Sequence, residues 1–256
     1  VNIPSFRLRA VDSKKNLEMR IGCGSFDTKT PLLTSAIMRM DINPQWIVPR
    51  SIIKKSIIPH LGNRSYFESH NFFVRERSTG KKISFDKVTS EMLNSSDYLV
   101  VQTGGIGNSL GRIIFRFNNS FSVFIHDTNQ HGVFSQEDRG VSHGCIRVQK
   151  PFSLAMFMLK DKNEDTISKI RYSMVAQIGG ESTVMYDEKH EGNSKLKTDT
   201  LNHSRIINNI NVNPKVPLFI TYFTLYPDFE GNIKSYSDVY GYDRVIFSIL
   251  KNYLGH

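Results

Sequence analysis

The chain has 256 residues, of which 39% are hydrophobic and 22% are charged, so it can bury a sizeable core and is not a disordered chain. Its formal net charge is +9, but the basic residues are scattered and form no recognisable nucleic-acid module, so we expect no nucleic-acid partner. A basic surface of this kind suits acidic polymers such as carboxylate-bearing cell-wall glycans. The length fits one large domain or two small ones.

The first part of the chain has the pattern of strands. Residues 3–40 alternate apolar and polar side chains in FRLRAV, LEMRIG and TSAIMRM, with turn-forming residues between these stretches. A period of two is typical of strands with one buried face, so we predict a β meander. The pattern changes in INPQWIVPRSIIKKSIIPHL, where prolines precede apolar residues spaced three and four apart. We therefore predict a mostly helical insertion over residues 43–97.

Strand patterns return at residues 99–102, 112–117 and 121–126, and the Asn-Asn-Ser between the last two predicts a hairpin turn. Helices are predicted from Pro151 onward and within DTISKIRYSMVAQI. Residues 179–209 are polar and rich in Gly, Asn, Ser and Lys, which predicts a mobile loop or insertion. Two further strands and a helix around DRVIFSILKNYL close the chain. The expected fold class is α+β, rich in strands, with helices at the edges.

Few features of the sequence bear on the compartment. The two cysteines, Cys23 and Cys145, can form at most one bridge and do not decide it. No stretch reaches the ~18 apolar residues that a membrane-spanning helix needs. The chain starts without Met or a signal peptide, directly in a strand pattern, as an excised domain would. Any export signal or membrane anchor is therefore expected outside these residues.

The block GVSHGCIRV places a histidine, a glycine and a cysteine side by side. A catalytic cysteine needs a base within reach and N–H donors for the developing oxyanion. His126, at the end of an apolar strand, and His143 are candidate bases, and the N–H groups of Gly144 and Cys145 are candidate oxyanion donors. Cys23 lies in a predicted strand with no histidine nearby, so we expect it to be a buried thiol.

A zinc site is the rival interpretation from the residues alone. It would use His126, His131, His143 and Cys145. The spacing of His126 and His131 is allowed for zinc, but His143-x-Cys145 does not match the usual ligand pairs. We therefore expect no metal and no cofactor.

His126, then fifteen residues, then Ser142-His143-Gly144-Cys145-Ile146-Arg147 resembles the signature of the YkuD-type L,D-transpeptidases. The resemblance extends to the larger periplasmic members, through the segments IHDTNQHGVFSQEDRGVSHGCIRV, NSLGRIIFRF, INPQWIVP and PLFITYFTLY…YSDVYGYD. It implies one catalytic domain over residues 1–256, built as a YkuD-like mixed β-sandwich or open barrel. Residues 43–97 would be a helical lid within it, and residues 179–209 are the clearest unmatched part.

The resemblance implies cysteine acyl transfer on cell-wall peptides. Members of the family take a peptidoglycan stem tetrapeptide as donor and form a thioester as the terminal D-Ala leaves. The stem then passes to an amine of a neighbouring stem, which gives a 3-3 cross-link. Peptidoglycan stem peptides would be the partners, carbapenem β-lactams the inhibitors, and the periplasm or cell envelope the location.

Carried over residue by residue, the resemblance makes Cys145 the nucleophile. It makes His126, rather than the nearer His143, the general base, oriented by a backbone carbonyl such as that of Asp127. Gly144 and Cys145 would supply the oxyanion N–H groups, and His143 would have a supporting role in catalysis. The expected substrate-binding residues are Arg147, Asp127, Ser142 and Trp46.

One residue departs from the family pattern, and three alternatives stay open. Position 147 carries Arg where many family members have Asn, which we interpret as a mark of the lid-bearing subgroup. Trp46, Tyr66 and Phe67 would line a donor channel or simply pack the lid.

The same thioester resolved by water would make the protein an L,D-carboxypeptidase or hydrolase. A catalytically retired wall-binding module is the alternative outside enzymes.

Overall fold

The computed structural model describes residues 1–13, 15–105, 107–159, 163–176, 202–228, 230–251 and 253, with the backbone alone at 183–184 and 198–199. The chain forms two compact units. Unit 1 consists of Val1–Met40, Phe115–Lys162 and Asn211–His256, and unit 2 of Asp41–Ile114 and Asn163–Ile210. The fold is mixed α+β and rich in strands, as the sequence predicted. Most of the predicted loop at 179–209 lies outside the described residues.

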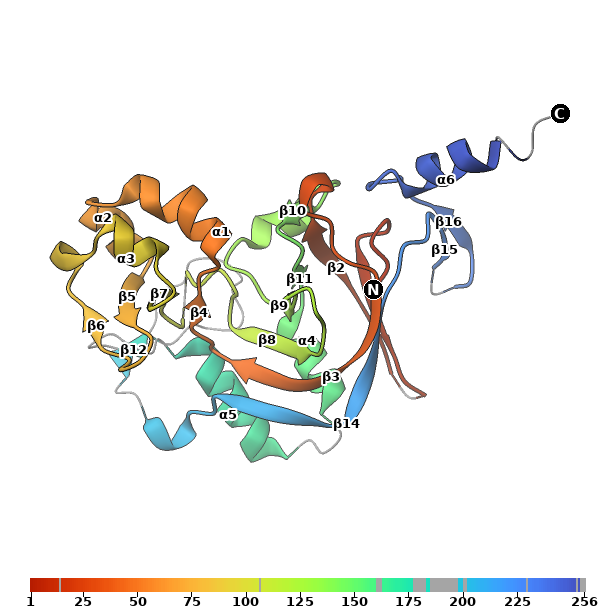
Figure 1. Cartoon of the computed structure of the whole chain (residues 1–256). Helices are drawn as coiled ribbons and strands as arrows, with labels where there is room; N and C mark the ends of the chain where they lie inside the picture. The colour runs from red at the N-terminus through yellow and green to blue at the C-terminus, as the bar shows by residue number, and fades with distance from the viewer. Residues whose placement is uncertain are drawn as a thin grey trace. The chain divides into compact units, whose positions relative to one another are not determined.

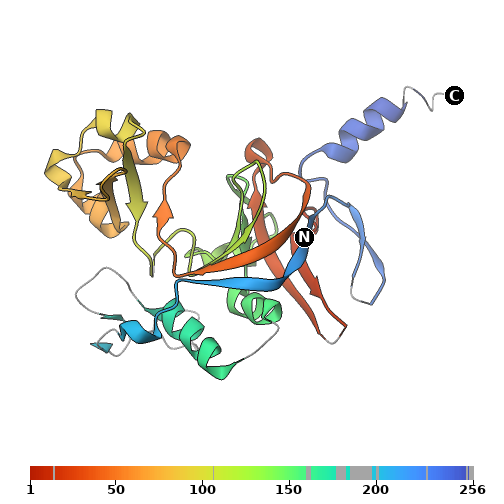
Figure 2. The same ribbon diagram turned by 60° about the horizontal axis from the view of Figure 1, so that its bottom comes forward.

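A curled sheet makes up most of unit 1 (Figures 1 and 2). Its strand order is β1-β2-β11-β9-β8-β3-β14, and β10 also pairs with β2. Figure 2 shows β14 running beside β3 along one side of this sheet. The strands are β1 (Arg7–Val11), β2 (Asn16–Gly24), β3 (Leu33–Ile42), β8 (Ile113–Phe117), β9 (Ile125–His126), β10 (Gly140–Ser142), β11 (Ile146–Val148) and β14 (Asn209–Ile220).

The pairing of the first three strands differs from the predicted meander. β1 and β2 form an antiparallel hairpin, with Arg7 opposite Arg20 and Val11 opposite Asn16. β3 does not continue the hairpin, because β11 occupies the other edge of β2 and β3 lies between β8 and β14. The three-stranded meander was therefore wrong, since alternation identifies strands but leaves their partners open.

The predicted helices of unit 1 are confirmed. α4 (Pro151–Met158) begins with Pro151, buries Leu154, Ala155 and Met158, and contacts β2. The closing helix is α6 (Tyr242–Lys251), which follows the hairpin of β15 (Leu225–Pro227) and β16 (Ile233–Ser235). No helix among the described residues combines the length and the apolar character that crossing a membrane requires.

Unit 2 has a sheet and an apolar core of its own. Strands β4 (Trp46–Ile47), β5 (Phe72–Glu76), β6 (Lys82–Ile83) and β7 (Tyr98–Gln102) lie in the order β4-β7-β5-β6. The helical elements are α1 (Arg50–Ile52), η2 (Ile53–Ile57), η3 (Ile58–His60), α2 (Arg64–Ser69), η4 (Phe85–Lys87), α3 (Ser90–Asn94), α5 (Glu164–Val175) and η6 (His203–Arg205). The short pair β12 (Thr183–Val184) and β13 (Thr198–Asp199) completes the unit.

The segment 43–97 therefore contains the predicted helices together with three strands that the sequence analysis did not predict. The strand at 99–102 is confirmed as β7, but it joins this second sheet. The core cluster of unit 2 consists of Val48, Ile53, Ile57, Phe67, Val74, Leu93 and Val100. The role of 43–97 as a lid stays a prediction.

Candidate active site

The GVSHGCIRV block lies in unit 1 as two short strands joined by His143, Gly144 and Cys145. β10 runs parallel to β2, and β11 runs antiparallel to it, with Arg147 opposite Gly22. The other edge of β11 pairs with β9 in parallel, which places Ile146 opposite Ile125 and Arg147 opposite His126. Segments distant in sequence thus position the block and His126 on neighbouring strands.

The register of β9 and β11 decides which side chains share a face of the sheet. Ile125 and Ile146 are opposite each other and completely buried on one face. Side chains alternate along a strand, so His126 and Arg147 belong to the opposite face. Cys145 lies just outside β11, directly before Ile146. The pairing of β9 with β11 therefore brings the two distant segments that carry the imidazole and the thiol next to each other.

His126 is buried and held in one orientation. Its side chain is 4% exposed, and its Nδ1 contacts the backbone carbonyl oxygen of Asp127. A carbonyl oxygen can only accept a hydrogen bond, so Nδ1 must carry the proton in this contact. Nε2 of the neutral ring is then unprotonated and able to accept a proton. The expected contact of His126 with the Asp127 carbonyl is present.

The Cys145 thiol is partly buried, and burial is the main influence on its ionisation. Desolvation raises the pKa of Cys145 above its ordinary value, while a hydrogen bond with the Phe124 backbone and the positive charges of Arg147 and Arg116 lower it. Because the raising influence is the largest, the resting group is a neutral thiol near pH 7. A nucleophile in this state needs a base to remove its proton.

The backbone at Gly144 requires glycine. Its φ is +110°, and a Cβ there would approach Cγ1 of Val123 to 3.3 Å. The Gly144 N–H donates a hydrogen bond to Oγ of Ser142 at 3.1 Å, so this expected oxyanion donor is engaged within the loop. In the described part of the chain, the Cys145 N–H has no hydrogen-bond acceptor. The geometry therefore favours the Cys145 N–H over that of Gly144 as an oxyanion donor.

Ser142, expected to bind substrate, is instead bonded within the protein. It is 5% exposed, and its hydroxyl donates to the backbone oxygen of Cys145 at 2.5 Å. Its own backbone oxygen accepts hydrogen bonds from the Thr28 hydroxyl at 2.7 Å and from the Ser25 N–H at 3.1 Å. These contacts fix the shape of the loop before Cys145.

A second group of hydroxyls, which the sequence analysis missed, supports the loop from segment 24–30. The Thr30 hydroxyl donates to the Gly144 oxygen at 2.8 Å and accepts from the Gly24 N–H at 2.9 Å. The Tyr240 hydroxyl accepts from the Thr30 N–H at 3.0 Å and donates to the Gly24 oxygen at 2.7 Å. Gly24 itself has no room for a Cβ, which would lie 2.1 Å from the Thr28 oxygen. No local pattern links Tyr240 to residue 144.

The remaining predicted residues differ in their surroundings. His143 is exposed, whereas Asp127 is 2% exposed and contributes its backbone oxygen to His126. Arg147 is half-buried, donates to Oε1 of Gln130 at 2.7 Å, and has its pKa lowered mainly by desolvation. Trp46 lies in β4 of unit 2, outside the unit that holds the other site residues.

The three aromatic residues proposed for a donor channel all pack within unit 2. Phe67 is 3% exposed in the core cluster, and Trp46 and Tyr66 pack against the same cluster. The Tyr66 hydroxyl also donates to the backbone oxygen of Ser56 at 3.0 Å. These contacts show that the three residues pack in unit 2, and their role in a donor channel stays a prediction.

Comparison with known proteins agrees with this geometry. The model of the YkuD L,D-transpeptidase catalytic domain matches residues 1–167, which include β9, β11 and the whole Cys145 block. The chain belongs to this family. A Haemophilus influenzae protein named "Putative L,D-transpeptidase" is 27% identical over 263 residues. That alignment covers 99% of this chain and 47% of the relative, so the chain spans about half the length of the curated relative it matches.

Proposed function

We propose that this YkuD-family protein is a peptidoglycan L,D-transpeptidase that joins stem peptides in 3-3 cross-links. The observation that supports the proposal is the pairing of β9 with β11, which brings the segment that carries Cys145 next to that of a tautomerically fixed His126. Nucleophilic catalysis by cysteine needs a thiol and a ring nitrogen that can accept its proton, and we propose that Cys145 and His126 supply them.

The acylation step begins with proton transfer from the Cys145 thiol to Nε2 of His126. The sulfur attacks the carbonyl carbon between the third stem residue and the terminal D-Ala, and the oxygen of the tetrahedral intermediate accepts a hydrogen bond from the Cys145 N–H. The carbon–nitrogen bond then breaks, and the His126 imidazolium returns its proton to the leaving amine of D-Ala. The product of this step is a thioester on Cys145.

Deacylation repeats these events with an amine of a second stem as the nucleophile. His126 removes a proton as the amine attacks the thioester, and the Cys145 sulfur leaves with that proton. The ionised acidic groups of cell-wall polymers suit the net charge of +9, and we propose the cell envelope as the place of action. Carbapenems are the proposed inhibitors because their strained lactam carbonyl can acylate the same thiol.

Product analysis with isolated muropeptides tests the proposal. The full chain is incubated with disaccharide tetrapeptides, and the products are separated and identified by mass. We expect dimers that have lost one D-Ala per cross-link, and no such dimers with Cys145→Ala. Trimmed tripeptides without dimers would replace the transferase with a hydrolase or carboxypeptidase. No loss of D-Ala at all would overturn an enzymatic role.

A further inference from the structure

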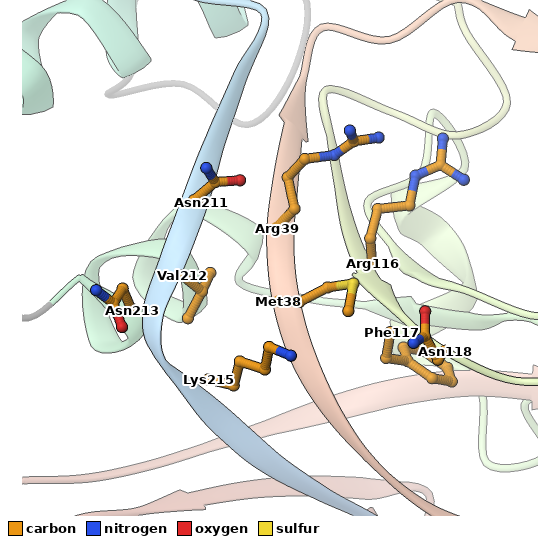
Figure 3. Close-up of a pocket in the computed structure, with 9 residues that line it drawn as sticks. All are labelled: Met38, Arg39, Arg116, Phe117, Asn118, Asn211, Val212, Asn213 and Lys215. Carbon is orange, nitrogen blue, oxygen red and sulfur yellow. The ribbon is translucent and has the colours of Figure 1, made fainter.

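A pocket of about 690 Å³, lined by six polar and three apolar residues, opens beside β3, β8 and β14 in unit 1 (Figure 3). Three of the nine residues that line it are cations, and three are asparagines. None of the nine is acidic. Its size suits a fragment of a few residues rather than a single ion. The polar lining residues are Arg39, Arg116, Lys215, Asn118, Asn211 and Asn213.

The arrangement of the cations fits a carboxylate. Figure 3 shows the guanidinium groups of Arg39 and Arg116 extending to the same side from β3 and β8. These strands are neighbours in the sheet. A guanidinium group presents paired N–H donors that match the two oxygens of a carboxylate. Asparagine amides both donate and accept hydrogen bonds, which suits the N–H and C=O groups of a peptide backbone.

Arg116 connects this pocket to the candidate active site. Its guanidinium carbon lies 4.5 Å from the centre of the Phe124 ring, and the Phe124 backbone oxygen accepts a hydrogen bond at 2.8 Å from the N–H of Ile146, the residue after Cys145. The positive charge of Arg116 also acts on the thiol and lowers its pKa. One residue that lines the pocket is therefore within electrostatic reach of the proposed nucleophile.

We propose that this pocket binds a carboxylate-bearing stem peptide, with Arg39 and Arg116 holding its free carboxylate close to Cys145. The proposal rests on the function proposed above and adds a specificity site to it. It assigns to Arg39 a contact with substrate that does not involve the thiol or His126.

Binding to the full chain carrying Cys145→Ala tests the proposal, because no turnover can then occur. The probes are a stem tetrapeptide with free carboxylates and the same peptide with every carboxyl amidated, each titrated by calorimetry. We expect Arg39→Gln to weaken binding of the acidic peptide about tenfold and to leave the amidated peptide unchanged. Lys215→Gln provides a second variant in the pocket, with a smaller effect in the same direction.

Arg244→Gln is the matched control, since it removes the same charge from an exposed position on α6. The proposal predicts that this variant keeps the wild-type preference for the acidic peptide over the amidated one. It is overturned if Arg244→Gln and Arg39→Gln weaken the acidic peptide equally, or if wild-type affinity does not distinguish the acidic from the amidated peptide. Tighter binding of a carboxylated glycan than of the acidic peptide would also overturn the peptide assignment. Failure of the transpeptidase proposal would appear separately, in the muropeptide products of the wild-type chain.

Discussion

Opposing influences act on the ionisation of Cys145. Burial favours the neutral thiol, and the charges of Arg116 and Arg147 favour the thiolate. Opposing influences also act on Cys23, where Tyr240 and Arg139 lower the pKa against burial. Cys23 is completely buried, and burial raises its pKa to about 11. The two thiols should therefore differ in reactivity by accessibility as well as by ionisation.

Alkylation with iodoacetamide measures this difference directly. Only the thiolate reacts, and a raised pKa means a small thiolate fraction at neutral pH, so the Cys145 rate should keep rising through and beyond pH ~8.5. Cys23 should remain unmodified in the folded protein over the same range. Peptide mapping by mass spectrometry reports both sites. Equal labelling of Cys23 and Cys145 would contradict the account.

The two candidate histidines should separate by kinetics. His126→Ala should slow acylation of Cys145 by roughly 10²–10⁴-fold, because it removes the proposed proton acceptor. His143 is exposed, so His143→Ala should leave a readily measurable rate. Stopped-flow acylation by a carbapenem gives both values. The roles would have to be exchanged if His143→Ala were the inactive variant.

Among the elements, the segment that follows β2 controls the shape of the loop before Cys145. Thr30 bridges Gly24 and Gly144, and Tyr240 bonds both the Thr30 N–H and the Gly24 oxygen. All these groups are in the interior, where an unpaired donor or acceptor is costly. The loop is therefore supported by backbone and hydroxyl groups that are far away in sequence.

Removing the Tyr240 hydroxyl tests how much these hydrogen bonds contribute to the free energy of unfolding. Tyr240→Phe leaves the Thr30 N–H and the Gly24 oxygen without this partner and should lower the free energy of unfolding by about 1–3 kcal/mol. Urea denaturation followed by circular dichroism measures the change. Tyr253→Phe is the matched control. Tyr253 is 83% exposed, so this substitution should leave the free energy of unfolding almost unchanged. An equal effect of both substitutions would argue against the network.

Local patterns in the sequence predicted the elements better than their partners. Alternation predicted β1, β2 and β3, and Pro151 predicted the start of α4. The alternation of apolar and polar residues could not predict that β11 separates β2 from β3, because strand pairing depends on contacts across the whole chain. The predicted strand at 121–126 is shorter in the structure, where β9 contains only Ile125 and His126.

The same limit applies to the site. The spaced His126 and Ser-His-Gly-Cys signature predicted two segments that the pairing of β9 with β11 brings next to each other. The sequence did not indicate that the Ser142 hydroxyl would accept a hydrogen bond from the Gly144 N–H, nor that Tyr240 supports the loop through Thr30. No helix or strand periodicity in the sequence links the residues that make these interactions. Local sequence thus predicted the contact of His126 with Asp127 and missed the hydroxyl network around Gly144.

On the scale of the whole molecule, two compact units are interleaved along the chain. Unit 2 contains the apolar cluster around Leu93, and unit 1 contains Cys145 and His126. Units with their own cores can respond separately to a core substitution. The single tryptophan, Trp46, packs against the cluster of unit 2 and provides a local probe of it.

Leu93→Ala should therefore affect the two units unequally. Leu93 is 1% exposed, and truncating a buried leucine costs about 2–5 kcal/mol, so the urea midpoint reported by Trp46 fluorescence should fall. The alkylation rate of Cys145 without urea should stay unchanged. Leu225→Ala, at a residue 65% exposed in unit 1, is the control that should change neither value. A parallel increase in Cys145 reactivity would show that the two cores are not independent.

The central claim is that Cys145 forms a covalent acyl-enzyme, and intact-mass spectrometry tests it most directly. Wild-type protein, Cys23→Ala and Cys145→Ala are each incubated with a carbapenem and with a stem tetrapeptide. We predict that wild type and Cys23→Ala gain the mass of one opened carbapenem, or of one stem that has lost D-Ala, and that Cys145→Ala gains neither. An adduct on Cys145→Ala, or none on the wild-type chain with either compound, would contradict the account.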